Sequence, residues 1–295
     1  MNLDSVDLSI AIPREYSMSL SKQHKLSLIA GSLLLAASGV YAAPDWSKVP
    51  KRNVQVFHAG VTPIEWVMDR THGGRTGLKK GETCIGCHED EEVVGKLNFD
   101  TSRLSGELEP VGAPKMVILP VAVQTAYDAE NLYLRLTFKA PPSGSTANKG
   151  DTDNAMKVTV LFPNDKVPQA AQSGCWATCH VDLRTMPKAA SQTKTKYVEG
   201  AYDLMQWASK DNKVSDGSVT TERKMSGGSL GAKAEATEKD GEYTVTFTRS
   251  NPGEGKAVPV GFAIHAEHAS GRFHHVSLGY LIGIGVEGDL KAVKQ

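Results

Sequence analysis

Two short stretches of the chain each place two cysteines directly before a histidine. They read Cys84-Ile85-Gly86-Cys87-His88 and Gly174-Cys175-Trp176-Ala177-Thr178-Cys179-His180. Cys-x-x-Cys-His is the signature that attaches a c-type haem to a protein. The second stretch has one more residue between its thiols, but positions i+3 and i+4 of a helical turn both lie on the face of residue i. Both stretches therefore predict a covalently bound haem c.

The predicted haem c residues fall into two sets. The thioether donors are Cys84, Cys87, Cys175 and Cys179, and the proximal iron ligands are His88 and His180. These motifs use all 4 cysteines of the chain, which a disulfide framework would pair in one of three ways. A zinc ion in a structural site takes four ligands, whereas each motif supplies three. A disulfide between Cys175 and Cys179 is the alternative for the longer motif, but it gives His180 no role.

The second axial ligand sets the potential of each iron, since a second histidine keeps it low and a methionine raises it. The mature chain holds six further histidines, which favours bis-histidine coordination. His72 is a candidate because it lies in a Gly-flanked loop twelve residues before Cys84, close enough to fold over the same iron. The thioether alternatives are Met68, Met156 and Met186, for which core packing is the simpler interpretation.

The first residues of the chain predict an export signal. Lys22 and Lys25 precede an apolar run over 26–40, which ends in Val40-Tyr41-Ala42. A basic start, a short apolar stretch and small residues before the cleavage point are typical of a signal peptide. The run is too short to span a membrane. We expect residues 1–42 to be upstream residues plus signal peptide, with a start at Met18, and a periplasmic mature chain without a membrane span.

Charge and length restrict the remaining possibilities. Lys+Arg and Asp+Glu balance at 33 each, so no nucleic acid or other polyelectrolyte partner is implied. Roughly 250 mature residues suffice for one large domain with an appendage. We assign residues 43–98 to a small irregular or helical haem c segment and residues 99–295 to a second haem c domain.

Alternating apolar residues with turn formers between them predict that the second domain is mainly β. The expected strands are 117–127, 132–138, 155–162, 241–249, 258–265 and 272–280. A Gly/Ser-rich loop is expected over 227–231. Several strands without a strong amphipathic helix favour an antiparallel β-sandwich. The longer cysteine motif is then an insertion between strands, and its porphyrin would complete the core.

Three histidines on the expected strands are candidate distal ligands of the second haem. Neighbouring side chains on a strand point to opposite faces, so only one of His274 and His275 reaches a given haem. The face of His274 is the more apolar, which ranks it slightly ahead as the residue facing the sandwich interior. His265 ends its own strand on the shallow face of Gly261 and Ala263. We expect at least one of these histidines to bind iron.

Four stretches carry a family resemblance: residues 126–133 (AYDAENLY), the strand before Phe162-Pro163, the motif at 174–180 (GCWATCH) and residues 203–207 (DLMQW). They resemble the ethylbenzene-dehydrogenase-related haem-binding domain, over roughly residues 99–285. The resemblance implies a β-sandwich akin to some carbohydrate-binding modules. It also implies kinship with the haem subunit of periplasmic molybdenum oxidoreductases. Members with the longer cysteine spacing bind haem c instead of haem b, and the motif at 84–88 after His72-Gly73-Gly74 resembles an extension of dihaem members.

The function expected from these features is electron transfer without catalysis. Two six-coordinate irons would carry single electrons and leave no position for a substrate. The rival functions are a small-molecule reductase or peroxidase and a haem-based gas sensor, each of which needs an open iron position. A membrane-anchored quinol-oxidising cytochrome and a periplasmic reductase are the redox partners expected by analogy.

Overall fold

The computed structural model describes residues 43–57, 64–68, 70, 72–98, 118–142, 155–179, 200–266 and 274–295. The predicted leader, His180 and Met186 lie outside the described residues. Residues Pro44–Gln295 form one compact unit. Strands are the predominant regular structure of the described residues and the helices are short, which confirms the prediction of a mainly β fold.

The strands follow one another along the chain with a few short helices between them. The strands are β1 (Arg52–Phe57), β2 (Ile118–Tyr127), β3 (Asn131–Lys139), β4 (Lys157–Pro163), β5 (Tyr202–Ala208), β6 (Lys213–Val219), β7 (Arg223–Lys224), β8 (Lys233–Lys239), β9 (Glu242–Ser250), β10 (Lys256–His265), β11 (His274–Val276), β12 (Tyr280–Ile284) and β13 (Leu290–Lys294). The helices are η1 (Trp46–Lys48), α1 (Ile64–Val67), α2 (Arg75–Lys79), α3 (Cys84–His88), α5 (Ala170–Ser173) and α6 (Cys175–Thr178). The predicted loop over 227–231 is confirmed.

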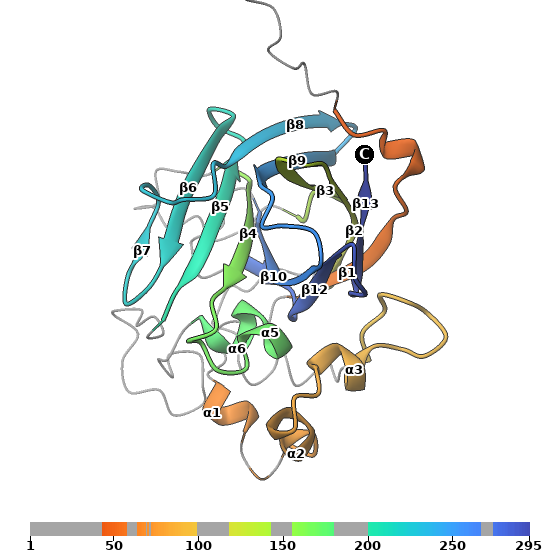
Figure 1. Ribbon diagram of the computed structural model, residues 1–295, viewed down its shortest axis with the longest axis vertical. Helices are drawn as coiled ribbons and strands as arrows, with labels where there is room; N and C mark the ends of the chain where they lie inside the picture. Colours follow the sequence, from red (N-terminus) through yellow and green to blue (C-terminus); the bar gives the residue numbers. More distant parts are fainter. Residues whose placement is uncertain are drawn as a thin grey trace, which may run out of the picture. The chain divides into compact units, whose positions relative to one another are not determined.

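The sheet closes on itself and carries extra strands on both sides of the closed part. Its order is β7-β6-β5-β4-β10-β11-β1-β2-β3-β9-β8, and β12 and β13 connect β10 back to β2 (Figure 1). Strands β11 and β12 follow each other along one edge of β10, and β1 and β13 share the place between them and β2; we call these six strands the barrel. The strand pairings are antiparallel, as expected, apart from β12–β13 and β13–β2, which are parallel.

Glycines explain how β13 can run beside β12 after so short a connection. Parallel neighbours normally need a crossover of a dozen residues or more, whereas only residues 285–289 separate these strands. Gly285 has φ +68°, and a Cβ at Gly283 would collide with the carbonyl of Val286. The chain can double back this tightly because these positions have no side chain.

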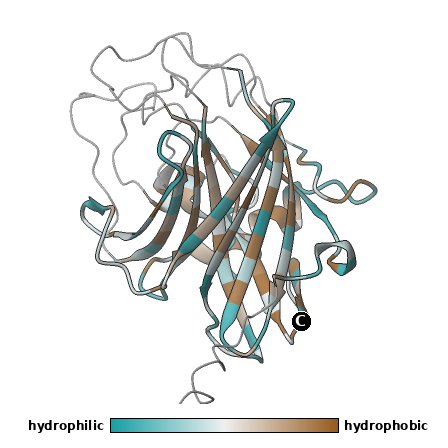
Figure 2. Ribbon diagram, turned by 90° about the horizontal axis from the view of Figure 1, so that it is seen from above, coloured by the Kyte–Doolittle hydropathy of each residue, from teal (hydrophilic) through white to brown (hydrophobic). Residues whose placement is uncertain are grey.

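Strand β1 was not among the predicted strands. It lies between β11 and β2 in the barrel, with Val54 paired to Val121 and Phe57 paired to Val276. Part of the segment 43–98, expected to be irregular or helical, therefore contributes a strand. Figure 2 shows apolar and polar residues alternating along several strands. Most of the buried apolar residues of the strands belong to one core cluster.

The short α-helices α1, α2, α3, α5 and α6 gather at one end of the strands (Figure 1). Helix α3 contacts α5, and α1 contacts α6. The Nε2 of Gln172 in α5 donates hydrogen bonds to the carbonyls of Leu78 at 2.8 Å and Glu82 at 2.6 Å. The two cysteine motifs thus lie on elements that are in contact. No helix among the described residues is long and apolar enough to cross a membrane.

Candidate haem sites

The first motif is a single helical turn with a capped start. Thr83 precedes α3, and its Oγ1 accepts a hydrogen bond from the N–H of Gly86 at 3.1 Å. This cap satisfies one N–H of the turn that contains Cys84, Cys87 and His88. Both cysteines are free thiols, Cys84 buried and Cys87 exposed. Burial raises the pKa of the Cys84 thiol to about 12, and the neighbouring Cys87 adds to the rise.

A second imidazole lies near His88, at a centroid distance that would fit one metal ion between the two rings. The ring centroids of His72 and His88 lie 6.2 Å apart, and the rings are inclined by 21°. A metal–imidazole bond is about 2 Å long, so two rings on opposite sides of one ion have centroids roughly 6 Å apart. The structure therefore brings together the proximal ligand and the distal candidate predicted for the first iron.

The residues of the first motif fit a haem c. The Nδ1 of His88 lies 3.4 Å from the carbonyl oxygen of Asn98, which directs the other ring nitrogen toward a metal. Burial lowers the pKa of His88, while the Asn98 carbonyl raises it and His72 lowers it. A lowered pKa favours the neutral imidazole, which is the form that binds metals. Cys84 and Cys87 would hold the porphyrin, and His88 and His72 would hold the iron.

The second motif begins at a glycine packed against the barrel. Gly174 has φ +65°, and a Cβ there would lie 2.8 Å from the N of Gly279. Helix α6 follows, and Cys179 is buried at 1% exposure. The Oγ1 of Thr178 and the hydroxyl of Tyr202 form a hydrogen bond. This turn is therefore fixed against both β5 and the residues after β11.

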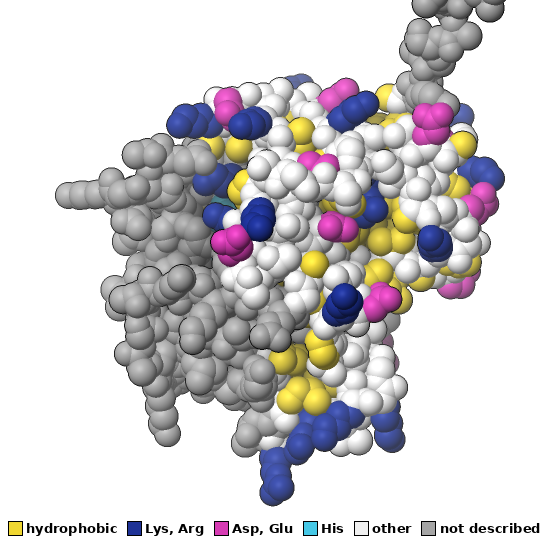
Figure 3. Space-filling view, turned by 60° about the vertical axis from the view of Figure 1, so that its left-hand side comes forward, with side chains coloured by type: hydrophobic (Ala, Val, Ile, Leu, Met, Phe, Trp, Pro, Cys, Tyr) yellow, Lys and Arg dark blue, Asp and Glu magenta, His cyan; other side chains and the backbone are white. Residues whose placement is uncertain are grey.

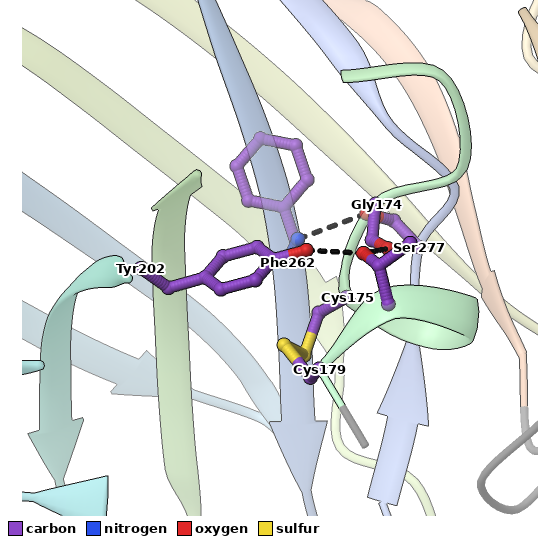
Figure 4. Close-up of a disulfide and its surroundings, with 7 residues drawn as sticks. Gly174, Cys175, Cys179, Tyr202, Phe262 and Ser277 are labelled. Atoms are coloured by element: carbon purple, nitrogen blue, oxygen red, sulfur yellow. Dashed lines mark hydrogen bonds between the residues drawn. A yellow bond between two sulfur atoms is a disulfide. The ribbon is translucent and has the colours of Figure 1, made fainter. Parts of the chain in front are cut away.

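Cys175 and Cys179 form a disulfide, with their Cα atoms 4.6 Å apart. Figure 4 shows it beside Tyr202 and below Phe262. A disulfide is the alternative considered for this motif, and it uses the sulfurs that two thioether bonds would need. The helical turn does place both sulfurs on one side, as a porphyrin requires. The cysteines fit a haem in the reduced state, and His180 lies outside the described residues.

The three strand histidines separate onto two faces. His265 pairs directly with His274 in the β10–β11 ladder, and Ile264 pairs with His275. Directly paired residues share a face. Ile264 belongs to the apolar core, so His275, at 1% exposure, faces the interior. The face of His274 also carries buried residues of this core, Val276 and Ala263, so both faces are buried and the ranking of His274 ahead of His275 stays a prediction.

His265 and His274 stack on each other. Their ring centroids are 4.7 Å apart at 18°, which is too close for two ligands on opposite sides of one iron. Burial lowers the pKa of His265 well below its ordinary value, and the nearby charges of His274, Lys157 and Arg223 lower it further. His265 is therefore neutral at physiological pH.

Several residues that position the sites had no sequence signal. Gln172 joins the two motifs, Asn98 orients His88 through its backbone, and Tyr202 holds Thr178. Each acts across at least ten residues of sequence through a contact that only the folded chain creates. Met156 is buried at 1% exposure in the apolar core, and Met68 packs against that core.

Comparisons with known proteins place the chain in a family. The sequence model of the family described as ethylbenzene dehydrogenase matches residues 43–258. Cytochrome c-552 of Stutzerimonas stutzeri is 44% identical over 273 residues, covering 86% of this chain and 92% of that protein. Cytochrome c-551 of Rhodocyclus tenuis is 41% identical over 259 residues, covering 86% of this chain and 100% of that protein.

Among solved structures, a carbohydrate-binding module of family 9 from Caldicellulosiruptor kristjanssonii in complex with cellotriose has a TM-score of 0.33 and 11% identity. That match covers 64% of this chain and 88% of that one. The family match covers more than half of the chain, and both relatives align over most of their length. The chain belongs to the ethylbenzene dehydrogenase family.

Proposed function

We propose that this protein is a periplasmic dihaem c-type cytochrome that carries single electrons between redox partners. The observation that carries the proposal is the facing pair His72 and His88, 6.2 Å apart, beside two free thiols on the turn of His88. The two relatives named as c-type cytochromes support it. An iron held by two imidazoles has no position open to a substrate, which favours electron transfer over catalysis.

Each haem has its own set of residues in this proposal. Cys84, Cys87, His88 and His72 serve the first haem, within residues 43–98. Cys175, Cys179 and His180 serve the second, within residues 99–295, with one of the three strand histidines as its distal ligand. The haem irons supply the one-electron redox couple, and the protein tunes their potentials through ligands and burial.

The partners and the compartment belong to the same proposal. Residues 1–42 are removed on export, and a membrane-anchored quinol-oxidising cytochrome donates electrons that a periplasmic reductase accepts. The rivals are a small-molecule reductase or peroxidase and a gas sensor. Either rival requires a reduced iron that binds an added ligand such as CO.

The mass and spectrum of the exported protein test this proposal. We expect a chain that begins after Ala42 and carries two haems and no free thiol, with a low-spin reduced spectrum that CO leaves unchanged. A chain with Cys84→Ala and Cys87→Ala should carry one haem. If the wild-type protein carries a single haem and retains the disulfide, the dihaem assignment is wrong. If its reduced form binds CO, an enzyme or a sensor replaces the carrier.

A further inference from the structure

A cavity of about 530 Å³ opens on the polar face of the sheet, near the ends of β4, β5, β6 and β10. This volume is within the range of cofactor sites. Its charged lining consists of Lys157, Lys210, Lys213, Arg223 and Asp211, and His265 also lines it. Figure 3 shows Lys and Arg side chains close together around a small histidine surface on this side.

The net positive charge of the cavity lining favours an anionic ligand. Four cationic side chains face one carboxylate in its lining. Within the described part of the chain, Lys210, Lys213 and Arg223 have no carboxylate at ion-pair distance. Like charges held together repel one another, so a ligand with more than one negative group would be favoured here.

Of the three strand histidines, His265 lines this cavity. It is 7% exposed, and its Nδ1 is buried without a hydrogen-bond partner among the described residues. The ring of His274 stacks on that of His265 at a centroid distance of 4.7 Å. At this distance only one of the two rings can bind a given iron. His275 lies on the opposite face with Ile264 and cannot reach the cavity.

The second cysteine motif lies on the same face of β10 as His265. A Cβ at Gly261 would be 3.5 Å from the N of Cys175. Gly261, Ala263 and His265 alternate onto one face, and Gly261 and His265 are about 13 Å apart along the strand. Gly261 and Ala263, which separate the motif from His265, are buried and carry only small side chains on this face. A flat tetrapyrrole in this place could therefore approach the strand closely.

We propose that the haem of the second motif lies along this face of β10. His265 is its distal iron ligand, and its two propionate groups enter the cavity beside Lys213 and Arg223. His274 stacks on His265 and positions it. This inference rests on the proposed function, because it requires haem on Cys175 and Cys179.

The ligand assignment is tested by CO binding to the reduced full-length protein. The chain with His265→Ala should bind one CO, whereas wild type and the control His275→Ala, on the opposite face of the ladder, should bind none. One CO bound by the His275→Ala chain and none by the His265→Ala chain would overturn the assignment. If the His265→Ala chain does not retain its second haem, the His265→Met chain tests the ligand assignment instead. It should keep a low-spin second haem with a raised potential, and an unchanged potential would overturn the proposal.

The propionate assignment is tested by a redox titration of the chain with Lys213→Gln and Arg223→Gln. Removing two cations beside the haem should favour the ferric state and lower the potential of the second haem, with the first haem unchanged. Lys239→Gln, at the exposed end of β8, is the control and should change neither potential. Two unchanged potentials would overturn this assignment. Counting the haems of the wild-type protein separates a failure of this inference from a failure of the proposed function. If the count is two, the proposed function holds even when the propionate or ligand assignment is wrong.

Discussion

Small contacts hold His72 and His88 in their facing positions. Gly74 lies beneath the ring of His72, where a Cβ would be 3.0 Å from Cε1. Asn98 offers its carbonyl oxygen to the Nδ1 of His88. A larger residue at position 74 would displace the first ring, and loss of the carbonyl would free the second to rotate. The separation of these rings therefore depends on both backbone segments that flank the first motif.

Replacing His72 tests whether it binds the first iron. His72→Met should raise the potential of one haem by on the order of 0.1 V, because a thioether ligand favours the ferrous state. A methionine–iron absorption band near the red end of the visible spectrum should appear with it. A redox titration followed by optical spectroscopy measures both effects. Lys80→Ala, an exposed change in the same segment, is the control. An unaltered spectrum in the His72→Met chain would move the distal ligand elsewhere.

At the scale of elements, side chains of β1 hold the loop that follows the first motif. Arg52 forms an ion pair with Glu89 at 2.8 Å, and both side chains are less than a fifth exposed, at 18% and 19%. The Oε1 of Gln55 accepts a hydrogen bond from the N–H of Leu97 at 2.8 Å. Strand β1 thus attaches the turn of His88 to the barrel.

The ion pair between Arg52 and Glu89 should contribute measurably to stability. Arg52→Ala leaves the Glu89 carboxylate half-buried without its partner, which should lower the free energy of unfolding by about 1.5–3 kcal/mol. Lys48→Ala breaks an exposed ion pair with Asp45 and should cost less than about 1 kcal/mol. Urea unfolding of the two haem-loaded proteins gives the comparison. Equal losses would mean that Arg52 does not secure the loop.

The sequence predicted those strands that are rich in apolar and β-branched residues and lie beside turn-forming residues. β2, β3, β4, β9 and β10 match their predicted ranges within two residues at each end. Strand β5 was missed because its sequence contains no β-branched residue and places Asp203 and Gln206 among its apolar residues. Strand β8 was missed for another reason. It is an exposed edge strand of small and charged residues with no apolar signal.

The candidate haem sites likewise contain residues that the sequence predicted and contacts that it could not predict. The cysteines and His88 could be found because a single helical turn encodes them. The approach of His72 to His88 and the cavity beside His265 depend on contacts between distant segments. The orientation of His274 and His275 depends on the register of β11 with β10, since a shift of one residue reverses the two faces. A single sequence does not specify that register.

At the scale of the whole molecule, both motifs contribute to one apolar core in unequal amounts. Leu78, Cys84 and Ile85 from the first segment belong to the same cluster of buried residues as Trp176 and Cys179 from the second. The second motif lies directly on β10, the strand that joins the barrel to β4. The first motif instead reaches the barrel through α5 and the β1 side chains. Loss of the second motif should therefore disturb more of the strands.

Paired cysteine replacements test this asymmetry. The double change Cys175→Ala and Cys179→Ala removes the bonds that these sulfurs form. It also leaves a cavity at Cys179, which is 1% exposed. We expect the free energy of unfolding to fall by more than about 3 kcal/mol, because filled core volume is lost. Cys84→Ala with Cys87→Ala removes one buried and one exposed thiol at the periphery, and about 1–2 kcal/mol should be lost.

Far-UV circular dichroism during thermal unfolding, with a haem count for each chain, measures the difference. The Cys84/Cys87 variant should keep the strand signal and one haem, whereas the Cys175/Cys179 variant should lose part of the strand signal before heating. The division at residue 98 predicts this contrast because it assigns the second haem to the core of the β domain. Equal losses of stability and of strand signal would show that the two motifs support the fold alike, and the division of the chain into two haem-binding parts would be wrong.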